Sequence, residues 1–171
     1  MKKILELRFF RHILIVVCLV VVLTTIYVNQ VGQKQDEVWL ADYKSYTKAI
    51  DDFKEKEYAK SILALNNLAE EYNSATIYWS LARNKVMVRN YDEAQEYFEM
   101  AREIYPAIVL KLAYLKDYSS ILAKNKNYDK ALMYFEVIEK RSTDEDDKEL
   151  ARDYIEHIKS RINNEGVDTN G

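Results

Sequence analysis

The hydrophobic pattern divides the chain into two parts of different character. Almost every residue from Ile13 to Val28 is apolar, and Asp, Glu, Lys and Arg are all absent between Arg11 and Lys34. From about residue 36 onward, apolar side chains instead recur at intervals of three and four, the spacing of one face of an α-helix. In chain order, we therefore predict one helix near residues 10–32, paired helices over 36–141 and a last helix over 144–162.

The apolar run predicts a single transmembrane helix. A hydrocarbon core of about 30 Å needs about 20 residues, and Phe9, Phe10 and Arg11 lengthen the run on one side. A cleaved signal peptide is the alternative, because the preceding residues are basic. The run is long for that role, however, and no small-x-small pair follows it. We therefore expect residues 1–35 to hold a short tip, a retained anchor and a juxtamembrane segment.

Charge indicates the orientation of this anchor. Four Lys or Arg residues precede the run and Lys34 alone follows it closely, so the positive-inside rule places the N-terminus in the cytoplasm and residues 36–171 outside it. Residues 29–171 hold 21 basic and 27 acidic side chains. That acidic balance argues against nucleic acid as a partner, since nucleic acid requires clustered basic surface.

Composition favours an all-α fold and excludes several kinds of site. The chain has three Gly, one Pro and one Cys, so it lacks the glycines of a P-loop or a dinucleotide-binding loop and cannot form an internal disulfide. His12 and His157 lie far apart in the sequence, and we read the acidic pairs as solvated helix faces. Cys18 is most simply an apolar side chain in the membrane. We expect no enzymatic activity, no cofactor and no metal.

The strongest signal is an internal repeat. The segments that begin Asn90-Tyr91-Asp92 and Asn127-Tyr128-Asp129 share seven identities at matched positions, 37 residues apart. A weaker copy begins at Glu57, 33 residues before the middle one. A period in the mid-thirties with helical patterning resembles the tetratricopeptide repeat, whose units stack into an α-solenoid of helix pairs. The resemblance covers about residues 40–141.

The resemblance implies which residues form the core. The positions that define the repeat are Tyr78, Leu81, Ala94, Phe98, Ala101 and Pro106 in the middle copy and Leu115, Tyr118, Ala131 and Phe135 in the last. The first copy is degenerate, because Ser61 replaces the small apolar residue. A stripe of Trp39, Tyr43, Tyr46, Ile50 and Phe53 is expected to pack against the next helix.

Helix-capping signals support these boundaries. Asn90 and Asn127 each precede a helix as N-cap residues, and an acid follows in the first turn, where the helix dipole favours it. Thr143 is the N-cap candidate of the last helix, which would cap the solenoid. Domain 36–162 then comprises about three helix pairs and the capping helix. We expect residues 163–171 to be a disordered tail.

The resemblance also implies a binding groove on the first helix of each repeat. The matching positions are Thr76, Trp79, Arg83, Val86 and Met87 in the middle copy and Ala113, Lys116, Ser120, Ala123 and Lys124 in the last. This set has cations and no acid, so we expect an acidic peptide with an apolar anchor, contacted by Trp79 and Met87 and held by the cations. Ala113 and Asp117 stand where the family's clamp for acidic chaperone tails needs basic residues, so that ligand is not implied.

Together these features predict a membrane-anchored, non-enzymatic adaptor that binds other proteins on the outer face of a bacterial cytoplasmic membrane. Two alternatives stay open from the sequence. The array could be a structural subunit that stacks on copies of itself in an oligomeric membrane assembly. It could also face the cytosol, as an anchored import receptor does, although the basic N-terminal flank disfavours that topology.

Overall fold

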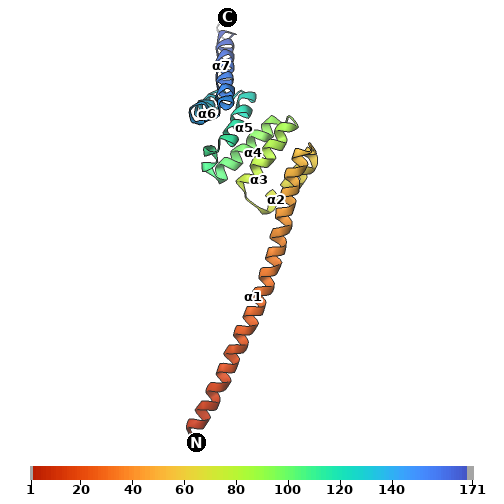
Figure 1. Ribbon diagram of the computed structural model, residues 1–171, viewed down its shortest axis with the longest axis vertical. Coiled ribbons are helices and arrows are strands. Elements are labelled where there is room, and N and C mark those ends of the chain that lie inside the picture. Colours follow the sequence, from red (N-terminus) through yellow and green to blue (C-terminus); the bar gives the residue numbers. More distant parts are fainter. Residues whose placement is uncertain (1, 169–171) are drawn as a thin grey trace. The chain divides into compact units, whose positions relative to one another are not determined.

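The computed structural model describes the backbone of residues 2–168 and the side chains of residues 16–164. The described chain is helical and contains no strand, which confirms the all-α prediction (Figure 1). Its elements are α1 (Lys2–Lys54), α2 (Tyr58–Glu71), α3 (Ala75–Met87), α4 (Tyr91–Ile104), the 3₁₀ helix η1 (Pro106–Leu110), α5 (Leu112–Lys124), α6 (Tyr128–Arg141) and α7 (Glu145–Asp168). The chain forms two compact units, divided between Ser45 and Tyr46.

All residues of the first unit from 2 to 45 are helical. Helix α1 continues through Gly32 without a break, whereas the sequence left open whether the apolar helix joins the next one. No atom lies within 4 Å of the place where a Cβ on Gly32 would stand, so this glycine serves no close packing. Thr24 and Thr25 satisfy their hydroxyls by donating to the carbonyl oxygens of residues 20 and 21, at 2.8–2.9 Å.

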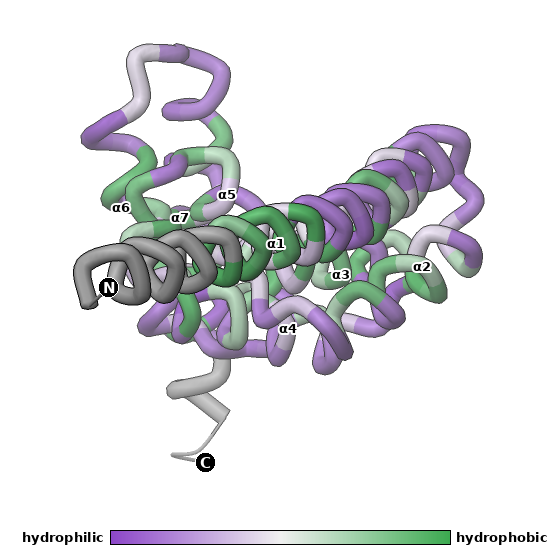
Figure 2. Tube along the Cα trace, turned by 90° about the horizontal axis from the view of Figure 1, so that it is seen from below, coloured by the Kyte–Doolittle hydropathy of each residue, from purple (hydrophilic) through white to green (hydrophobic). Residues whose placement is uncertain are grey.

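Among the described residues, α1 is the one helix that is long and apolar enough to cross a membrane. The candidate segment Val16–Lys54 reaches a mean hydropathy of 1.7, and none of that apolar window is buried. Figure 2 shows the change from apolar to polar residues along it. A retained anchor and a cleaved signal sequence share these properties. The side chains of residues 2–15, including the basic flank that predicts orientation, lie outside the described part.

The predicted aromatic stripe is divided between the two units. Trp39 and Tyr43 are 63% and 56% exposed, and their rings stack on each other with centroids 5.6 Å apart. Tyr46, Ile50 and Phe53 are half-buried in the second unit. The stripe therefore has two environments, although its spacing is uniform.

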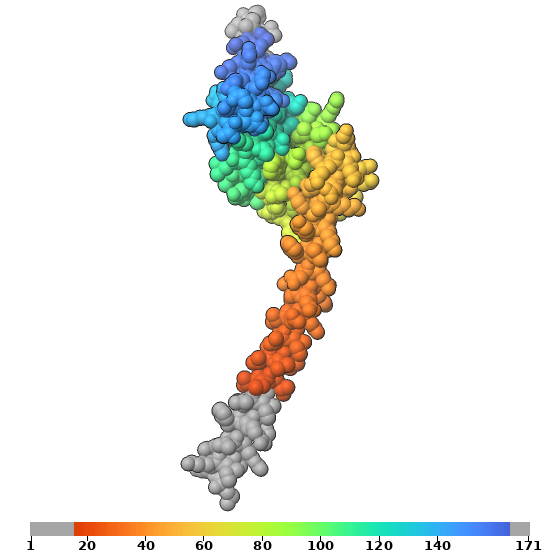
Figure 3. Space-filling view, in the orientation of Figure 1, coloured from red at the N-terminus to blue at the C-terminus, as the bar shows by residue number. Residues whose placement is uncertain are grey.

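The second unit is a solenoid of helix pairs. α3 packs on α4 and α5 on α6, and successive helices follow one another across the unit, as the colour gradient in Figure 3 shows. Residues 72–74 connect the first pair to the second, whereas residues 105–111, which include η1, connect the second to the third. The longer connector accounts for the repeat spacing of 37 instead of 33 residues. Pro106 begins η1, so it follows the end of α4.

The core forms where the repeat predicts close helix contacts. Ala94 and Ala131 have no exposed surface, and Phe98 and Phe135 beside them are also fully buried. The hydroxyl of Tyr114 donates a 2.6 Å hydrogen bond to the carbonyl oxygen of Phe98. Small alanines bring the helices together, and aromatic rings fill the space between repeats.

The first repeat packs less regularly than the others. Ala49 from the end of α1 joins Leu65 and Leu68 of α2 and Leu81 of α3 in a separate small core. Ser61 occupies the position of Ala94 and Ala131; it is fully buried, and its hydroxyl has no hydrogen-bond partner in the described part of the chain. The degenerate sequence of this copy thus corresponds to a poorer interface.

The predicted N-caps have different outcomes. Asn90 precedes α4 and accepts from the backbone N–H of Glu93 at 3.4 Å, while its amide donates to the Glu93 carboxylate at 2.6 Å. Asn127 precedes α6, but its side chain makes no capping hydrogen bond. The residue before each of these, Arg89 or Lys126, has φ near +60°, which turns the chain into the second helix.

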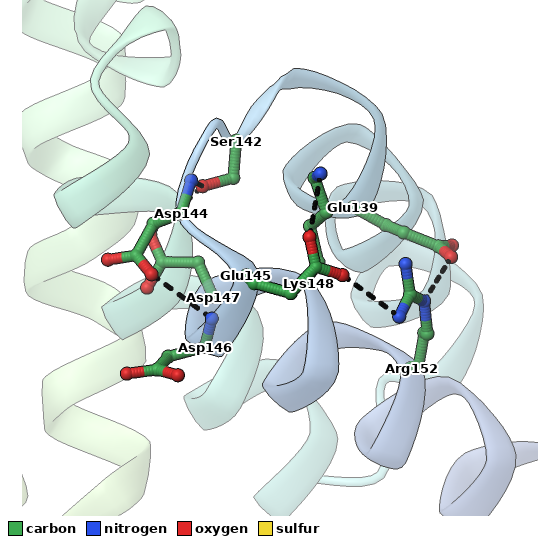
Figure 4. Close-up of polar contacts among 8 residues, drawn as sticks. All are labelled: Glu139, Ser142, Asp144, Glu145, Asp146, Asp147, Lys148 and Arg152. Atoms are coloured by element: carbon green, nitrogen blue, oxygen red, sulfur yellow. Dashed lines mark hydrogen bonds and ion pairs between the residues drawn. The ribbon is translucent and has the colours of Figure 1, made fainter.

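The last helix differs from the prediction at both ends. α7 begins at Glu145, and its N-cap is Asp144 instead of Thr143, because the Asp144 carboxylate accepts from the backbone N–H of Asp146 at 3.0 Å (Figure 4). Arg152 joins α7 to Glu139 of α6 at 3.0 Å. The predicted disordered tail is helical through Asp168, and residues 169–171 lie outside the described residues.

Candidate binding groove

The first helices of the three repeats enclose a pocket on one face of the array. Its volume is about 190 Å³, and its lining comes from the end of α1, from α3 and from α5. The lining residues are Phe53, Arg83, Val86, Met87, Asp117, Ser120, Ile121 and Lys124. Pockets for drug-sized ligands measure about 300–1,000 Å³. This pocket is smaller and suits a single large side chain.

One wall of the pocket is apolar. Phe53, Val86, Met87 and Ile121 supply it, and Met87 is 48% exposed. The guanidinium of Arg83 lies over the Phe53 ring, 5.0 Å from its centroid. An aromatic ring, two aliphatic side chains and a flexible thioether form a surface that accommodates apolar side chains of varied shape.

Asp117 brings an acid into the pocket. Its Oδ2 accepts a 3.1 Å hydrogen bond from Trp79 Nε1 and lies 3.5 Å from Arg83 Nε. Desolvation raises the pKa of the Asp117 carboxyl, and the Trp79 hydrogen bond and the charges of Arg83 and Lys116 oppose that rise. The ten groove positions given by the repeat register include no acid, but the pocket does, and Asp117 forms an ion pair with Arg83.

The two lysines predicted for the groove have different partners. Lys116 Nζ forms a 2.6 Å ion pair with Asp147 of α7, and this hydrogen bond is the main reason that the pKa of Asp147 is lowered. Lys124 Nζ lies 5.0 Å from the centroid of the Tyr91 ring. Within the described residues no carboxylate lies in ion-pair range of Lys124. Lys124 is thus the pocket cation without an acidic partner among the described residues.

The structure brings half of the predicted groove residues together. Those that line the pocket are Arg83, Val86, Met87, Ser120 and Lys124. Thr76 and Ala113 are exposed outside it. Trp79 and Ala123 are half-buried and packed against the core, with Trp79 edge-on to Tyr114 at 5.8 Å. Trp79 therefore positions Asp117 and does not line the pocket. Of the two residues predicted to contact an apolar anchor of the ligand, Met87 alone lines it.

The sequence did not place Phe53, Asp117 or Ile121 among the groove residues, although it put Phe53 in the aromatic stripe and Asp117 at a position of the family's clamp. Phe53 was accessible from the repeat register, since it precedes Val86 by the 33 residues that separate the first two copies. The same offset relates Tyr46 to Trp79, and the Tyr46 hydroxyl lies 3.3 Å from Ser80 Oγ. Asp117 carried a weaker signal, because its role depends on Trp79 and Arg83 in the previous repeat.

Solved structures share this fold. The tetratricopeptide domain of Arabidopsis OM64 superimposes with a TM-score of 0.57 at 14% identity, covering 70% of this chain and 95% of that one. The type III secretion translocator chaperone SycD of Yersinia enterocolitica gives a TM-score of 0.59 at 11% identity, with coverages of 71% and 85%. No protein-family model and no curated protein matches the sequence. The likeness confirms a tetratricopeptide-type α-solenoid.

The pocket combines charged, polar and apolar side chains. Among the residues that the structure describes, no group of three or more His, Cys, Asp and Glu residues could hold a metal. The pocket contains one ion pair, one further cation, one hydroxyl and an apolar wall. Such a set can bind an apolar side chain and orient a charged neighbour.

Proposed function

We propose that this protein is a membrane-anchored, non-enzymatic adaptor that binds a peptide segment of another protein in the groove. The observation that carries the proposal is the pocket between α1, α3 and α5, which combines an apolar wall with a cation that has no acidic partner among the described residues. Repeat solenoids use their extended concave surfaces for binding. The solved neighbours, a tetratricopeptide domain and a secretion chaperone, support a role in protein interaction.

The ligand in this proposal has an apolar anchor and an acidic residue beside it. The anchor enters the pocket between Phe53, Val86 and Met87. The acid pairs with Lys124. Arg83 and Lys116, which the sequence suggested as further acid-binding residues, are already paired with Asp117 and Asp147. The proposal therefore assigns the ligand acid to one cation, whereas the sequence alone suggested three.

The membrane anchor in this proposal is the apolar part of α1. Its described residues from Val16 to Val28 are exposed, and all except Thr24 and Thr25 are apolar. A helix of this kind buries its side chains in a bilayer, where its backbone hydrogen bonds are satisfied internally. The four Lys or Arg residues before it support a cytoplasmic N-terminus and an extracytoplasmic array.

A pair of methionines allows a matched test. Met87 lines the pocket and is 48% exposed, and Met133 on the second helix of the last repeat is 49% exposed. A photo-crosslinking amino acid is placed at either position in the full chain, in its native membrane. Position 87 should yield a discrete adduct with one partner, and position 133 should not. Equal yields of the same adduct from both positions would contradict the groove as the binding site.

A further inference from the structure

Asp117 is the one acid among the eight described residues that line the pocket. A single oxygen, Oδ2, receives the hydrogen bond from Trp79 and faces the Nε of Arg83. Both partners lie on α3, whereas Asp117 lies on α5. The carboxylate thus neutralises the cation that this end of the pocket would otherwise offer to a ligand.

The other end of the pocket keeps its positive charge. Asp117, Ser120, Ile121 and Lys124 follow one another on one face of α5, at the spacing of successive helical turns. Asp117 and Lys124 are two turns apart, about 10 Å along the helix axis. The pocket therefore has a neutralised end at Arg83 and a cationic end at Lys124, and Ser120 and Ile121 of α5 lie between Asp117 and Lys124.

An extended peptide advances about 3.3 Å per residue, so about three residues span the two ends. Resting on the proposed function, we propose that Asp117 is the specificity-determining residue of the groove. It makes the groove accept a ligand carboxylate at the Lys124 end and reject one at the Arg83 end. The favoured ligand is an extended segment with acid on one side of an apolar anchor and no acid on the other.

The ion pair between Arg83 and Asp117 is partly exposed, so it disfavours a ligand acid at this end of the pocket but does not exclude one. The side chains of Arg83 and Asp117 are 50% and 38% exposed, and their 3.5 Å separation is long for a charge-assisted hydrogen bond. A second acid on the ligand would have to displace Asp117 from Arg83 and would also face its negative charge. Removing that charge should therefore open a second acid-binding position.

Three labelled peptides of equal length test the proposal. Each has a central leucine and blocked ends, with glutamates before it, after it or on both sides, and glutamines at the remaining positions. Binding to the full chain in detergent micelles is measured by fluorescence anisotropy at low ionic strength, where exposed charges are least screened. For the wild type, one singly acidic peptide should bind about two- to fivefold more tightly than the other. The doubly acidic peptide should bind no better than the preferred one.

Substitutions then separate the contributions. Asp117→Asn should make the doubly acidic peptide the tightest ligand, again by about two- to fivefold. Adding Arg83→Gln to Asp117→Asn should remove that gain, and Lys124→Gln should remove the wild-type preference. Asp92→Asn, on an exposed position of α4, makes the same change of charge outside the pocket and should keep the wild-type order.

The outcomes distinguish the two proposals. If the doubly acidic peptide binds most tightly to the wild type, or if Asp117→Asn leaves the order unchanged, the groove binds peptides but Asp117 does not set its specificity. If none of the peptides binds to the wild type or to any variant, the proposed groove function fails, and the role of Asp117 fails with it.

Discussion

Two regions of this protein are rich in apolar side chains, but they arrange these side chains differently. The side chains described between Val16 and Val28 are all exposed, whereas those of Ala94, Phe98, Ala131 and Phe135 are fully buried. In the first region apolar residues cover every side of the helix, so a neighbouring protein helix could cover only part of it. In the second they form one face, and polar residues occupy the other. The comparison shows that periodicity, and not hydrophobicity alone, separates a helix suited to lipid from a helix suited to stacking.

A charge in the apolar run should have the largest effect. Val21→Arg places a cation in the middle of the run and should release most of the protein from the membrane, since insertion is disfavoured by about 2.5–3.5 kcal/mol. Membrane flotation measures the bound fraction. Val38 is the matched control, because it is also 56% exposed but lies beyond the run. Equal release by Val21→Arg and Val38→Arg would show that the run is not the anchor.

Overfilling the core tests the second region. Ala131→Leu inserts three heavy atoms where the alanine has no exposed surface, and it should lower the free energy of unfolding by about 1–3 kcal/mol. Ala94→Leu should behave in the same way. Urea titration of the full chain in micelles gives the change. Ala59, which is exposed on α2, should tolerate leucine within about 0.5 kcal/mol. An unchanged midpoint for both core variants would contradict the observed repeat register.

A buried hydroxyl provides a smaller test of the same core. Tyr114→Phe removes the hydrogen bond to the Phe98 carbonyl oxygen and keeps the ring, so it should cost about 1 kcal/mol. Tyr105→Phe removes a hydroxyl from a residue that is 50% exposed and should have little effect. If the two variants lose equal stability, the hydrogen bond adds nothing to the interface between α4 and α5.

The ion pair between Lys116 and Asp147 should have the smallest effect, and pH reveals it. The pKa of Asp147 is lowered in the folded protein from its ordinary value of 3.8, chiefly by the Lys116 hydrogen bond. Its stabilising contribution is therefore present above that value and is lost as pH falls through the folded pKa. Between about pH 7 and about pH 3, the wild type should lose slightly more stability than Asp147→Asn. Identical pH profiles would show that the pair does not couple α7 to α5.

The sequence predicted the features that depend on local pattern. Helix type follows from apolar spacing that recurs within one or two turns, and the repeat register and the close packing at Ala94 and Ala131 follow from the similarity of segments 37 residues apart. The continuity of α1 through Gly32 escaped prediction, because a glycine with open space around it does not end a helix. The 3₁₀ helix η1 also escaped, since Pro106 marks the end of α4 without specifying the conformation of the residues after it.

The site was harder to predict than the fold for a physical reason. Arg83 and Lys116 are cations in the sequence, but Asp117 and Asp147 neutralise them from other helices, 34 and 31 residues away. Whether a cation on the array is free or paired depends on contacts with neighbouring helices. A repeat alignment compares equivalent positions of single repeats, so it does not show these ion pairs. Phe53 shows the converse, since projecting the register one repeat backward would have found it.

The four methionines offer the most direct test of the central claim, that the face formed by α1, α3 and α5 is the binding site. The full chain in micelles is labelled with ¹³C at the methionine methyl groups and titrated with the peptide that carries leucine between glutamates on one side and glutamines on the other. The methyl resonance of Met87 should shift, while those of Met100 and Met133, on the second helices, stay in place. A shift at Met100 or Met133 with Met87 unchanged would contradict the account.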